Sequence, residues 1–183
     1  MVEDQDFHKV KKIIYVLILL LVFGSKSYSQ NFKLEKLVKL DAPWGSSFIN
    51  DREIIVTEKS GKIKIVNILS KEIKEISHQL NFVVHGQGGL LDIIHKDNYI
   101  WISYTEDRGG YKTSTSIARA EFNKKKLNFK NIFQANPPID SGYHFGSRLA
   151  IKGKYLFASA GERGEGMIAQ DPSKHPGSII RIN

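Results

Sequence analysis

The sequence has 183 residues, a formal net charge of +8 and no cysteine. The lack of cysteine excludes disulfides and thiolate metal sites, so packing alone has to hold the fold together. The positive charge is spread along the chain. Its one dense run, Lys124–Lys126, is expected to be a solvated turn, so we predict no nucleic-acid partner.

Residues 1–29 have the pattern of an N-terminal extension followed by a signal peptide. Basic residues precede an unbroken apolar run of eleven residues, 13–23. That run is shorter than the about 20 residues of a membrane span and fits the about 7–15 of a signal-peptide core. The small residues Ser27 and Ser29 predict cleavage after Ser29, and an uncleaved anchor is the alternative. Both forms predict a periplasmic or secreted domain, with no stable membrane span after cleavage.

From Gln30 onward the chain is predicted to be all-β. Short apolar runs that alternate or are rich in β-branched residues are separated by Gly, Asn, Asp and Lys, and none has a sustained helical period. The clearest predicted strands are Glu53–Thr57, Lys62–Ile68, Tyr99–Tyr104, Ser116–Phe122, Tyr155–Ser159 and Ser178–Ile182.

A weak internal repeat groups these strands. Each copy begins near a glycine (Gly45, Gly89 or Gly146), and its next strand runs into an acidic residue (Glu58, Glu106 or Glu162). The glycines are 44 and 57 positions apart, and repeats of about 40–50 residues with four strands are typical of β-propeller blades.

Residues 30–183 therefore hold about three four-stranded antiparallel blades, whereas a closed propeller needs about 4–8. We expect an incomplete propeller domain in a chain that stops early, either as a gene fragment or as a trimmed polypeptide. Closure by self-association of two such chains is the alternative, since three blades alone leave two open sheet edges.

Two polar residues have a physical case for chemistry. Gln87 lies among three glycines, where its amide can reach a ligand, although a plain turn explains the same pattern. His144 lies between a loop and a strand, so we expect it at a strand mouth, where an imidazole can act as a general base. Glu162 can orient that imidazole and Arg148 can oppose it with positive charge. A histidine that only caps the strand end is the alternative.

Other site types are not indicated. His85, His95 and His175 have loop-like flanks and are expected to be solvated. The sequence contains no H-x-H or H-E-x-x-H spacing, no EF-hand loop and no G-x-S-x-G motif, so we predict no metal site on this chain and no nucleophile-elbow hydrolase.

Five ordered motifs together resemble the soluble aldose/glucose sugar dehydrogenases that use pyrroloquinoline quinone (PQQ), over Leu40–Asn183. They are Pro43-Trp44-Gly45 with Val56-Thr57-Glu58, the run Gly86–Asp92, His144 with Gly146–Leu149, the turn Gly161–Gly164, and Gln170-Asp171 leading to Gly177–Asn183.

This resemblance implies a propeller of six blades, of which about three are present. It implies PQQ and calcium as cofactors, His144 as the base that takes the sugar proton, and Glu162 as its supporting acid. It also implies that Gln87 and His144 contact the cofactor, and that Gln87, Gln170 and Asp171 contact the sugar.

The resemblance further implies that an aldose is oxidised to a lactone and that an exported quinone or cytochrome accepts the electrons. The family's cofactor clamp and calcium ligands come from later blades, so we expect this chain to be inactive alone. The alternative functions are a non-catalytic exported propeller that binds glycan or protein, and a calcium-dependent lactonase whose ligands would include Glu58, Glu106 and Glu162.

Overall fold

We describe a computed structural model of the chain, which covers Lys11, residues 14–15 and residues 32–183. Leu37–Asn183 forms one compact unit and Met1–Lys36 another. The predicted signal segment, 1–29, lies outside the described residues except at Lys11 and residues 14–15, so its boundary stays a prediction. Among the described residues, no helix has the length and hydropathy needed to cross a membrane.

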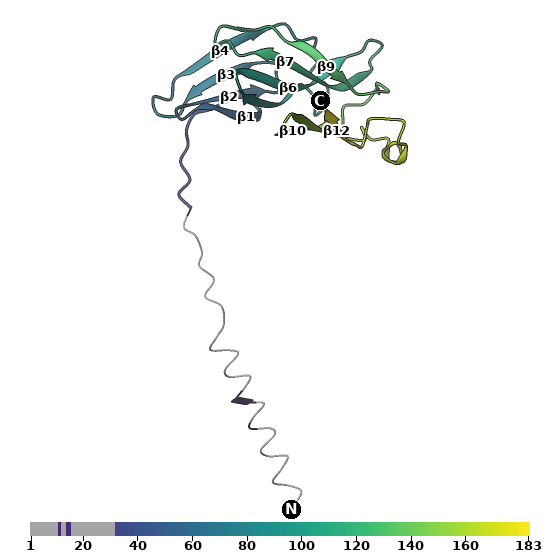
Figure 1. Cartoon of the computed structure of the whole chain (residues 1–183), viewed down its shortest axis with the longest axis horizontal. Helices are drawn as coiled ribbons and strands as arrows, with labels where there is room; N and C mark the ends of the chain where they lie inside the picture. The colour runs from purple at the N-terminus through teal and green to yellow at the C-terminus, as the bar shows by residue number, and fades with distance from the viewer. Residues whose placement is uncertain (1–10, 12–13, 16–31) are drawn as a thin grey trace, which may run out of the picture. The chain divides into compact units, whose positions relative to one another are not determined.

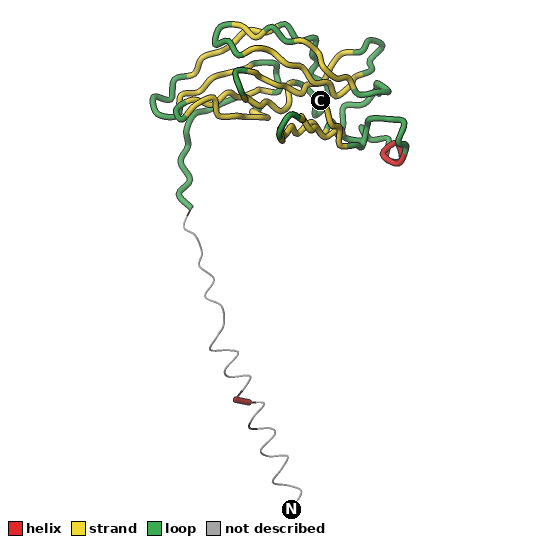
Figure 2. Tube along the Cα trace, viewed as in Figure 1, coloured by secondary structure: helices red, strands yellow, loops and turns green. Residues whose placement is uncertain are grey.

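Three β-sheets account for most of the unit Leu37–Asn183 (Figures 1 and 2). The first contains β1 (Pro43–Asn50), β2 (Glu53–Glu58), β3 (Ile63–Asn67), β4 (Ile73–His78) and the two-residue β8 (Lys126–Leu127). The second contains β5 (Leu90–Lys96), β6 (Tyr99–Asp107), β7 (Thr113–Glu121) and β9 (Lys130–Gln134). The third contains β10 (Gly146–Lys152), β11 (Tyr155–Ala160) and β12 (Ile179–Ile182).

The sheets confirm the prediction of an all-β chain built from successive antiparallel blades. All six predicted strands are present, and their bounds differ from the predicted ones by at most three residues. Two details differ from three equal four-stranded blades: β8 adds a parallel fifth strand beside β4, and the third sheet has three strands in the described chain. Lys124 and Lys125 lie in the expected turn, whereas Lys126 begins β8.

The first hairpin of every sheet carries the same irregularity. The pairs Pro43–Glu58, Leu90–Tyr104 and Gly146–Ala160 are each followed by a bulge in the first strand. A hydroxyl of the second strand accepts a hydrogen bond from the backbone amide at each bulge: Thr57 from Gly45 at 3.0 Å, Ser103 from Asp92 at 2.9 Å, and Ser159 from Arg148 at 3.0 Å. The three sheets are therefore copies of one unit, as the repeat predicted. The glycines are not equivalent within it, because Gly45 lies two residues after the pairing position of its strand, Gly89 one residue before it and Gly146 at it.

This register revises the alignment of the acidic residues. Glu106 and Glu162 each lie two residues after the strand position that pairs at the bulge, so they are equivalent. Glu58 occupies the pairing position itself, two residues earlier in its sheet. The three glutamates are thus not one repeated feature.

Buried apolar side chains hold neighbouring sheets together. One cluster contains Ile55 and Ile63 of the first sheet with Leu90 and Ile100 of the second. A second cluster joins the second and third sheets through Ile117, Leu149, Leu156 and Ala158. Burial of these surfaces supplies the main driving force for stacking the blades, which places the loops at one end of each sheet side by side.

Glu58 is a fully buried carboxylate in the first sheet. Its Oε1 accepts hydrogen bonds from the Asp41 amide and from Lys64 Nζ, both at 2.7 Å, and its Oε2 is buried without a partner. Burial raises the pKa of Glu58, but the hydrogen bonds from Lys64 and Asp41 outweigh it and hold the pKa below the usual 4.5. The charged form is therefore the one the fold stabilises.

We expect Glu58 to make stability depend on pH in the acid range. Because its folded pKa is depressed, its contribution is present above pH 4.5 and is lost as the pH falls through the folded pKa. The free energy of unfolding, measured with urea, should therefore fall more steeply toward acid pH for the wild type than for Glu58→Gln. Glu75→Gln is the control, since the Lys62–Glu75 pair is 3.7 Å long and more than half exposed. Parallel pH profiles for wild type and Glu58→Gln would contradict the assignment.

Candidate active site

His144 and Glu162 meet at one end of the third sheet. His144 lies two residues before β10 and Glu162 two residues after β11, and these strands pair at Gly146 and Ala160, so the fold brings the two side chains together. His144 Nδ1 is hydrogen-bonded to Glu162 Oε1. The His144 side chain is 53% exposed and that of Glu162 29%, so the imidazole is accessible from solvent. The predicted pairing of these two residues is present.

The pair has the electrostatics of an oriented base. The hydrogen bond from His144 holds the pKa of Glu162 below its usual value, so the carboxylate is charged at neutral pH. A carboxylate on Nδ1 favours the tautomer that carries its proton there, which leaves the Nε2 lone pair free to accept another. The Gly164 amide donates a further hydrogen bond of 3.2 Å to Glu162 Oε1 and helps to fix the carboxylate.

Gln87 holds the loop that carries His144. The side-chain Oε1 of Gln87 accepts a hydrogen bond from the backbone amide of His144 at 2.9 Å. The backbone amide of Gln87 donates to the Gly142 carbonyl at 2.8 Å. His144 has a φ of +50°, a left-handed conformation that costs free energy unless the surroundings impose it. Gln87 therefore acts on the backbone of His144, and its predicted contacts with cofactor and sugar stay predictions.

Two glycines permit this close approach. Gly86 has a φ of +56°, and a Cβ there would lie 2.4 Å from the Gly142 carbonyl oxygen. A Cβ at Gly161 would lie 1.7 Å from the carbonyl oxygen of His144. The two glycine-containing loops therefore pack backbone to backbone, which no residue with a side chain would allow.

Arg148 pairs with Asp92, so its contacts do not support the expectation that it opposes Glu162 at His144. Its guanidinium donates to Asp92 Oδ1 at 3.0 Å and lies 5.1 Å from the centre of the Trp44 ring. Arg148 lies in the bulge of β10, and the stacking of the sheets turns it toward β5.

The structure does not join Gln170 and Asp171 to this site. Gln170 ends a short 3-10 helix, η1 (Gly166–Gln170), and Asp171 follows it. Asp171 accepts hydrogen bonds from the hydroxyl and amide of Ser173 and pairs with Lys174 at 3.2 Å, and these contacts lower its pKa. Within residues 32–183, no hydrogen bond or ion pair connects either residue to His144, Glu162 or Gln87, so their predicted role in sugar binding stays a prediction.

The three glutamates of the repeat do not converge on one point. Glu106 accepts hydrogen bonds from Ser116, Asn131 and Gln134, whereas Glu58 and Glu162 bind Lys64 and His144. In the described part of the chain, no group of three or more His, Cys, Asp or Glu side chains could hold a metal ion. These separate environments argue against the calcium-dependent lactonase.

Two of the histidines that were expected to be solvated, His95 and His175, have structural contacts. His95 is part of β5 rather than a loop and packs against the Phe122 ring at 5.0 Å, and burial lowers its pKa. His175 Nδ1 accepts a hydrogen bond of 2.9 Å from the Asn136 amide and its ring contacts Phe133. The prediction that these two are merely solvated is wrong.

Arg163 is a site residue that the sequence did not single out beyond its place in the Gly161–Gly164 turn. An arginine between glycines in a polar turn has the pattern of an exposed residue, yet Arg163 is only 3% exposed. No periodic signal marks it, because its burial comes from a loop that folds over it.

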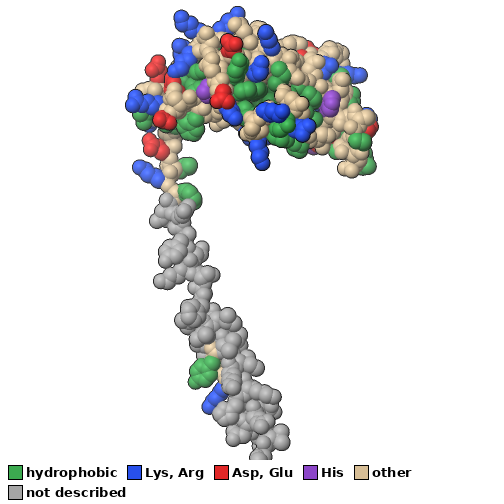
Figure 3. All heavy atoms as spheres, viewed as in Figure 1, with side chains coloured by type: hydrophobic (Ala, Val, Ile, Leu, Met, Phe, Trp, Pro, Cys, Tyr) green, Lys and Arg blue, Asp and Glu red, His purple; other side chains and the backbone are tan. Residues whose placement is uncertain are grey.

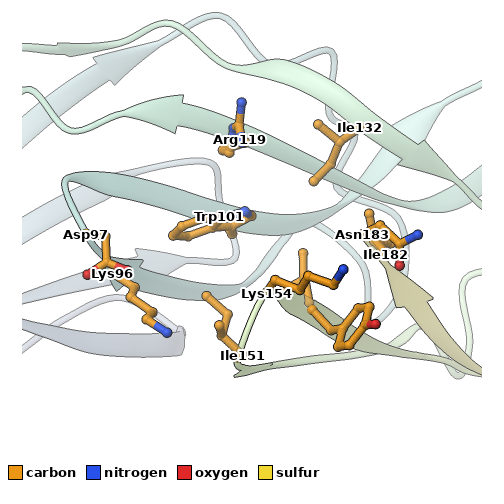
Figure 4. Close-up of a pocket in the computed structure, with 12 residues that line it drawn as sticks. Lys96, Asp97, Trp101, Arg119, Ile132, Ile151, Lys154, Ile182 and Asn183 are labelled. Atoms are coloured by element: carbon orange, nitrogen blue, oxygen red, sulfur yellow. The ribbon is translucent and has the colours of Figure 1, made fainter.

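One hollow lies near the end of the sheets that carries His144, and another lies at the opposite end. One of about 570 Å³ is lined by residues of the loop before Gln87 and of the β6–β7 hairpin, among them Val84, His85 and Tyr111. The other, of about 410 Å³, contains Trp101, Ile151 and Lys154 and reaches the β5–β6 and β10–β11 turns (Figure 4). Those turns are at the opposite strand ends from His144, so the second hollow is separate from the candidate site.

The blade-like sheets define a β-propeller protein, and one of its hairpins carries an accessible His–Glu pair at the loop end. Residues 40–183 match the family model described as glucose / sorbosone dehydrogenase. The chain belongs to this family.

The relatives with known names are sugar dehydrogenases. The chain is 31% identical over 154 residues to the aldose sugar dehydrogenase YliI of Escherichia coli (strain K12), and the match covers 79% of this chain and 42% of that protein. The crystal structure of the soluble aldose sugar dehydrogenase from Escherichia coli in the apo-form has a TM-score of 0.74 at 31% identity, over 79% of this chain and 44% of that one.

A PQQ-bound aldose sugar dehydrogenase from Streptomyces coelicolor has a TM-score of 0.73 over 82% of this chain and 47% of that chain. At 22% identity, this likeness concerns the fold alone. The chain thus spans less than half the length of the relatives it matches.

Proposed function

We propose that this chain supplies the proton-abstracting part of an enzyme that oxidises aldose sugars to lactones with PQQ. The observation that carries the proposal is the accessible His144–Glu162 pair, held by Gln87 at the loop end of two neighbouring blades. In the reaction, His144 Nε2 takes the proton of the anomeric hydroxyl as the C1–H bond breaks and the lactone carbonyl forms. When bound, PQQ supplies the acceptor for the hydride of C1.

The residues of this chain assist that step in distinct ways. Glu162 stabilises the imidazolium that forms, because its carboxylate is charged and hydrogen-bonded to Nδ1. Gln87 keeps the His144 backbone in place through the His144 amide. Both effects raise the rate by presenting Nε2 in one orientation before the sugar arrives.

The described residues fit the quinone in part. Lys59 Nζ donates to the Gly86 carbonyl beside Gln87, so a cation and an amide lie near the base, and both suit a ligand with carbonyl and carboxylate oxygens. Among the described residues, no group of three or more His, Cys, Asp or Glu side chains could hold a metal ion. In our proposal, calcium and the main contacts to PQQ therefore depend on parts of the protein outside these residues, and an exported quinone or cytochrome takes the electrons.

We expect dye reduction with glucose, PQQ and calcium from the complete product of the gene that encodes this chain, and none from the 183-residue polypeptide. The physical reason is that a positioned base cannot oxidise a sugar unless the hydride acceptor is held against C1. Turnover by the 183-residue polypeptide that His144→Ala abolishes would contradict the division of roles. Tight glycan binding by the complete product without dye reduction would favour the non-catalytic propeller.

We further propose that the protein is exported and cleaved after Ser29, as the apolar run 13–23 and the small residues behind it suggest. Expression of the chain in a bacterium with a periplasm, followed by intact-mass measurement, should give a product that begins at Gln30. A cytoplasmic product of full mass would contradict export, and a membrane-bound product of full mass would favour the uncleaved anchor.

A further inference from the structure

We infer that Arg163 is a positioning residue that fixes the His144–Glu162 pair, an inference that rests on the proposed role of His144. Arg163 directly follows Glu162 in the chain, and its buried guanidinium reaches back to the loop on both sides of His144. The proposed proton transfer to His144 does not itself use this buried cation.

The contacts of the guanidinium bracket His144. Nε donates to the Tyr143 carbonyl at 2.9 Å, and the guanidinium carbon lies 3.6 Å from the centre of the Phe145 ring. Arg163 therefore holds the residue before the base by a hydrogen bond and the residue after it by a cation–π contact. Arg163 NH2 also donates a hydrogen bond to the Ser141 carbonyl, which fixes the same loop.

The other end of this connection is the second sheet. NH1 donates to the Thr113 carbonyl at 3.2 Å and NH2 to Thr113 Oγ1 at 2.8 Å. Thr113 begins β7, whose strand pairing runs along the whole of β6. The loop that carries His144 is thus tied through one side chain to the most extensively paired hairpin of the protein.

The chemistry of the site explains why an arginine is required. Its partners are neutral: carbonyl oxygens, one hydroxyl and an aromatic face, which a planar fork of five donors can satisfy together. Burial lowers the pKa of Arg163 to about 10, so the guanidinium remains charged at neutral pH. A lysine keeps the charge but has only three donors on one nitrogen, which are too few for the four hydrogen bonds of the guanidinium.

Both residues of the catalytic pair depend on this connection. His144 and Arg163 have φ values of +50° and +62°, in the left-handed region that non-glycine residues rarely adopt. Because Arg163 and Glu162 are adjacent, the bonds that hold the guanidinium also hold the backbone from which the Glu162 carboxylate extends. Loss of the Arg163 guanidinium should let the backbone at His144 and the backbone at Glu162 relax. It should thereby weaken the hydrogen bond between His144 Nδ1 and the Glu162 carboxylate.

The test is a nitrogen NMR measurement of the His144 ring in the full chain labelled at histidine, with the signal assigned by His144→Gln. In the wild type we expect the Nδ1–H tautomer to dominate. In Arg163→Lys we expect the ratio of the two tautomers to move toward the Nε2–H form by roughly threefold or more, as for a weakened charge-assisted hydrogen bond. This readout needs neither cofactor nor turnover, so its failure is distinct from failure of the proposed function.

Thr113→Val provides a milder variant in case Arg163→Lys does not fold, because it removes one acceptor of the guanidinium and keeps the shape. We expect a smaller shift of the tautomer ratio in the same direction. Thr57→Val is the matched control: Thr57 is an equally buried threonine whose hydroxyl bonds to Gly45 and Leu91 in the neighbouring part of the fold. An unchanged tautomer ratio in Thr113→Val, with a stability loss like that of Thr57→Val, would show a structural role only and overturn the inference.

Discussion

Replacement of His144 by glutamine is expected to lower kcat/KM for aldose oxidation by the complete gene product by about 10²–10⁴-fold, the usual contribution of a general base. Glutamine keeps the length and polarity of the side chain but cannot accept the hydroxyl proton. The backbone bond from the residue 144 amide to Gln87 remains possible, so the loop should keep its place. The loss should therefore fall on kcat more than on KM.

Steady-state dye reduction over a range of sugar concentrations measures this effect. His175→Gln is a suitable control, since His175 contacts Asn136 and Phe133 away from the pair and an amide oxygen can replace its acceptor nitrogen. A His144→Gln enzyme with kcat within about threefold of wild type, instead of the expected loss of at least about a hundredfold, would remove His144 from the role of base.

Replacement of Asp92 by asparagine should lower the free energy of unfolding by about 1–3 kcal/mol, the cost of leaving a buried polar group without its partner. Asp92 lies at the bulge of β5, and its side chain is only 3% exposed. Its Oδ2 accepts from the Leu149 amide at 2.8 Å, and its Oδ1 accepts from Arg148 at 3.0 Å. An amide offers one oxygen instead of two, so one donor of the third sheet loses its acceptor.

Urea unfolding of the chain checks this prediction. The matched control is Asp97→Asn, which makes the same chemical change at an exposed turn position of the same hairpin and should alter stability little. Equal effects of the two substitutions would show that Asp92 does not link the second and third sheets. Because Asp92 bonds the strand that follows His144, a large effect also implies that blade stacking supports the candidate site.

Much of the fold was predictable because its signals are local. Strands such as Tyr155–Ala160 alternate buried and accessible residues along six positions, a pattern that needs no knowledge of neighbours. The glycine spacing marks the length of the repeat only approximately, because the three glycines lie at different positions of the bulged hairpin. His144 and Glu162 could be paired from the sequence because they flank the two strands of one hairpin.

The strands that were not predicted have weak or broken patterns. β4 (Ile73–His78) buries only Ile76 and is otherwise accessible or half-accessible, so its apolar alternation is faint. The bulges interrupt the alternation of β5 and β10 near Asp92 and Arg148, where one strand carries more residues than its partner. A prediction from alternating residues therefore misses the strand at a bulge.

An all-β chain of repeated blades, with a histidine and a glutamate at the ends of one hairpin, could be predicted from the sequence because periodicity, turn residues and chain proximity encode these features locally. The partners of the arginines could not be predicted, because they depend on how the sheets pack. The stacking of the second and third sheets turned Arg148 toward Asp92 instead of His144, and the loop 137–143 closed over Arg163. The contacts of Arg163 with Thr113 and of Arg148 with Asp92 join residues 50 or more positions apart, and their geometry depends on the packing of whole sheets.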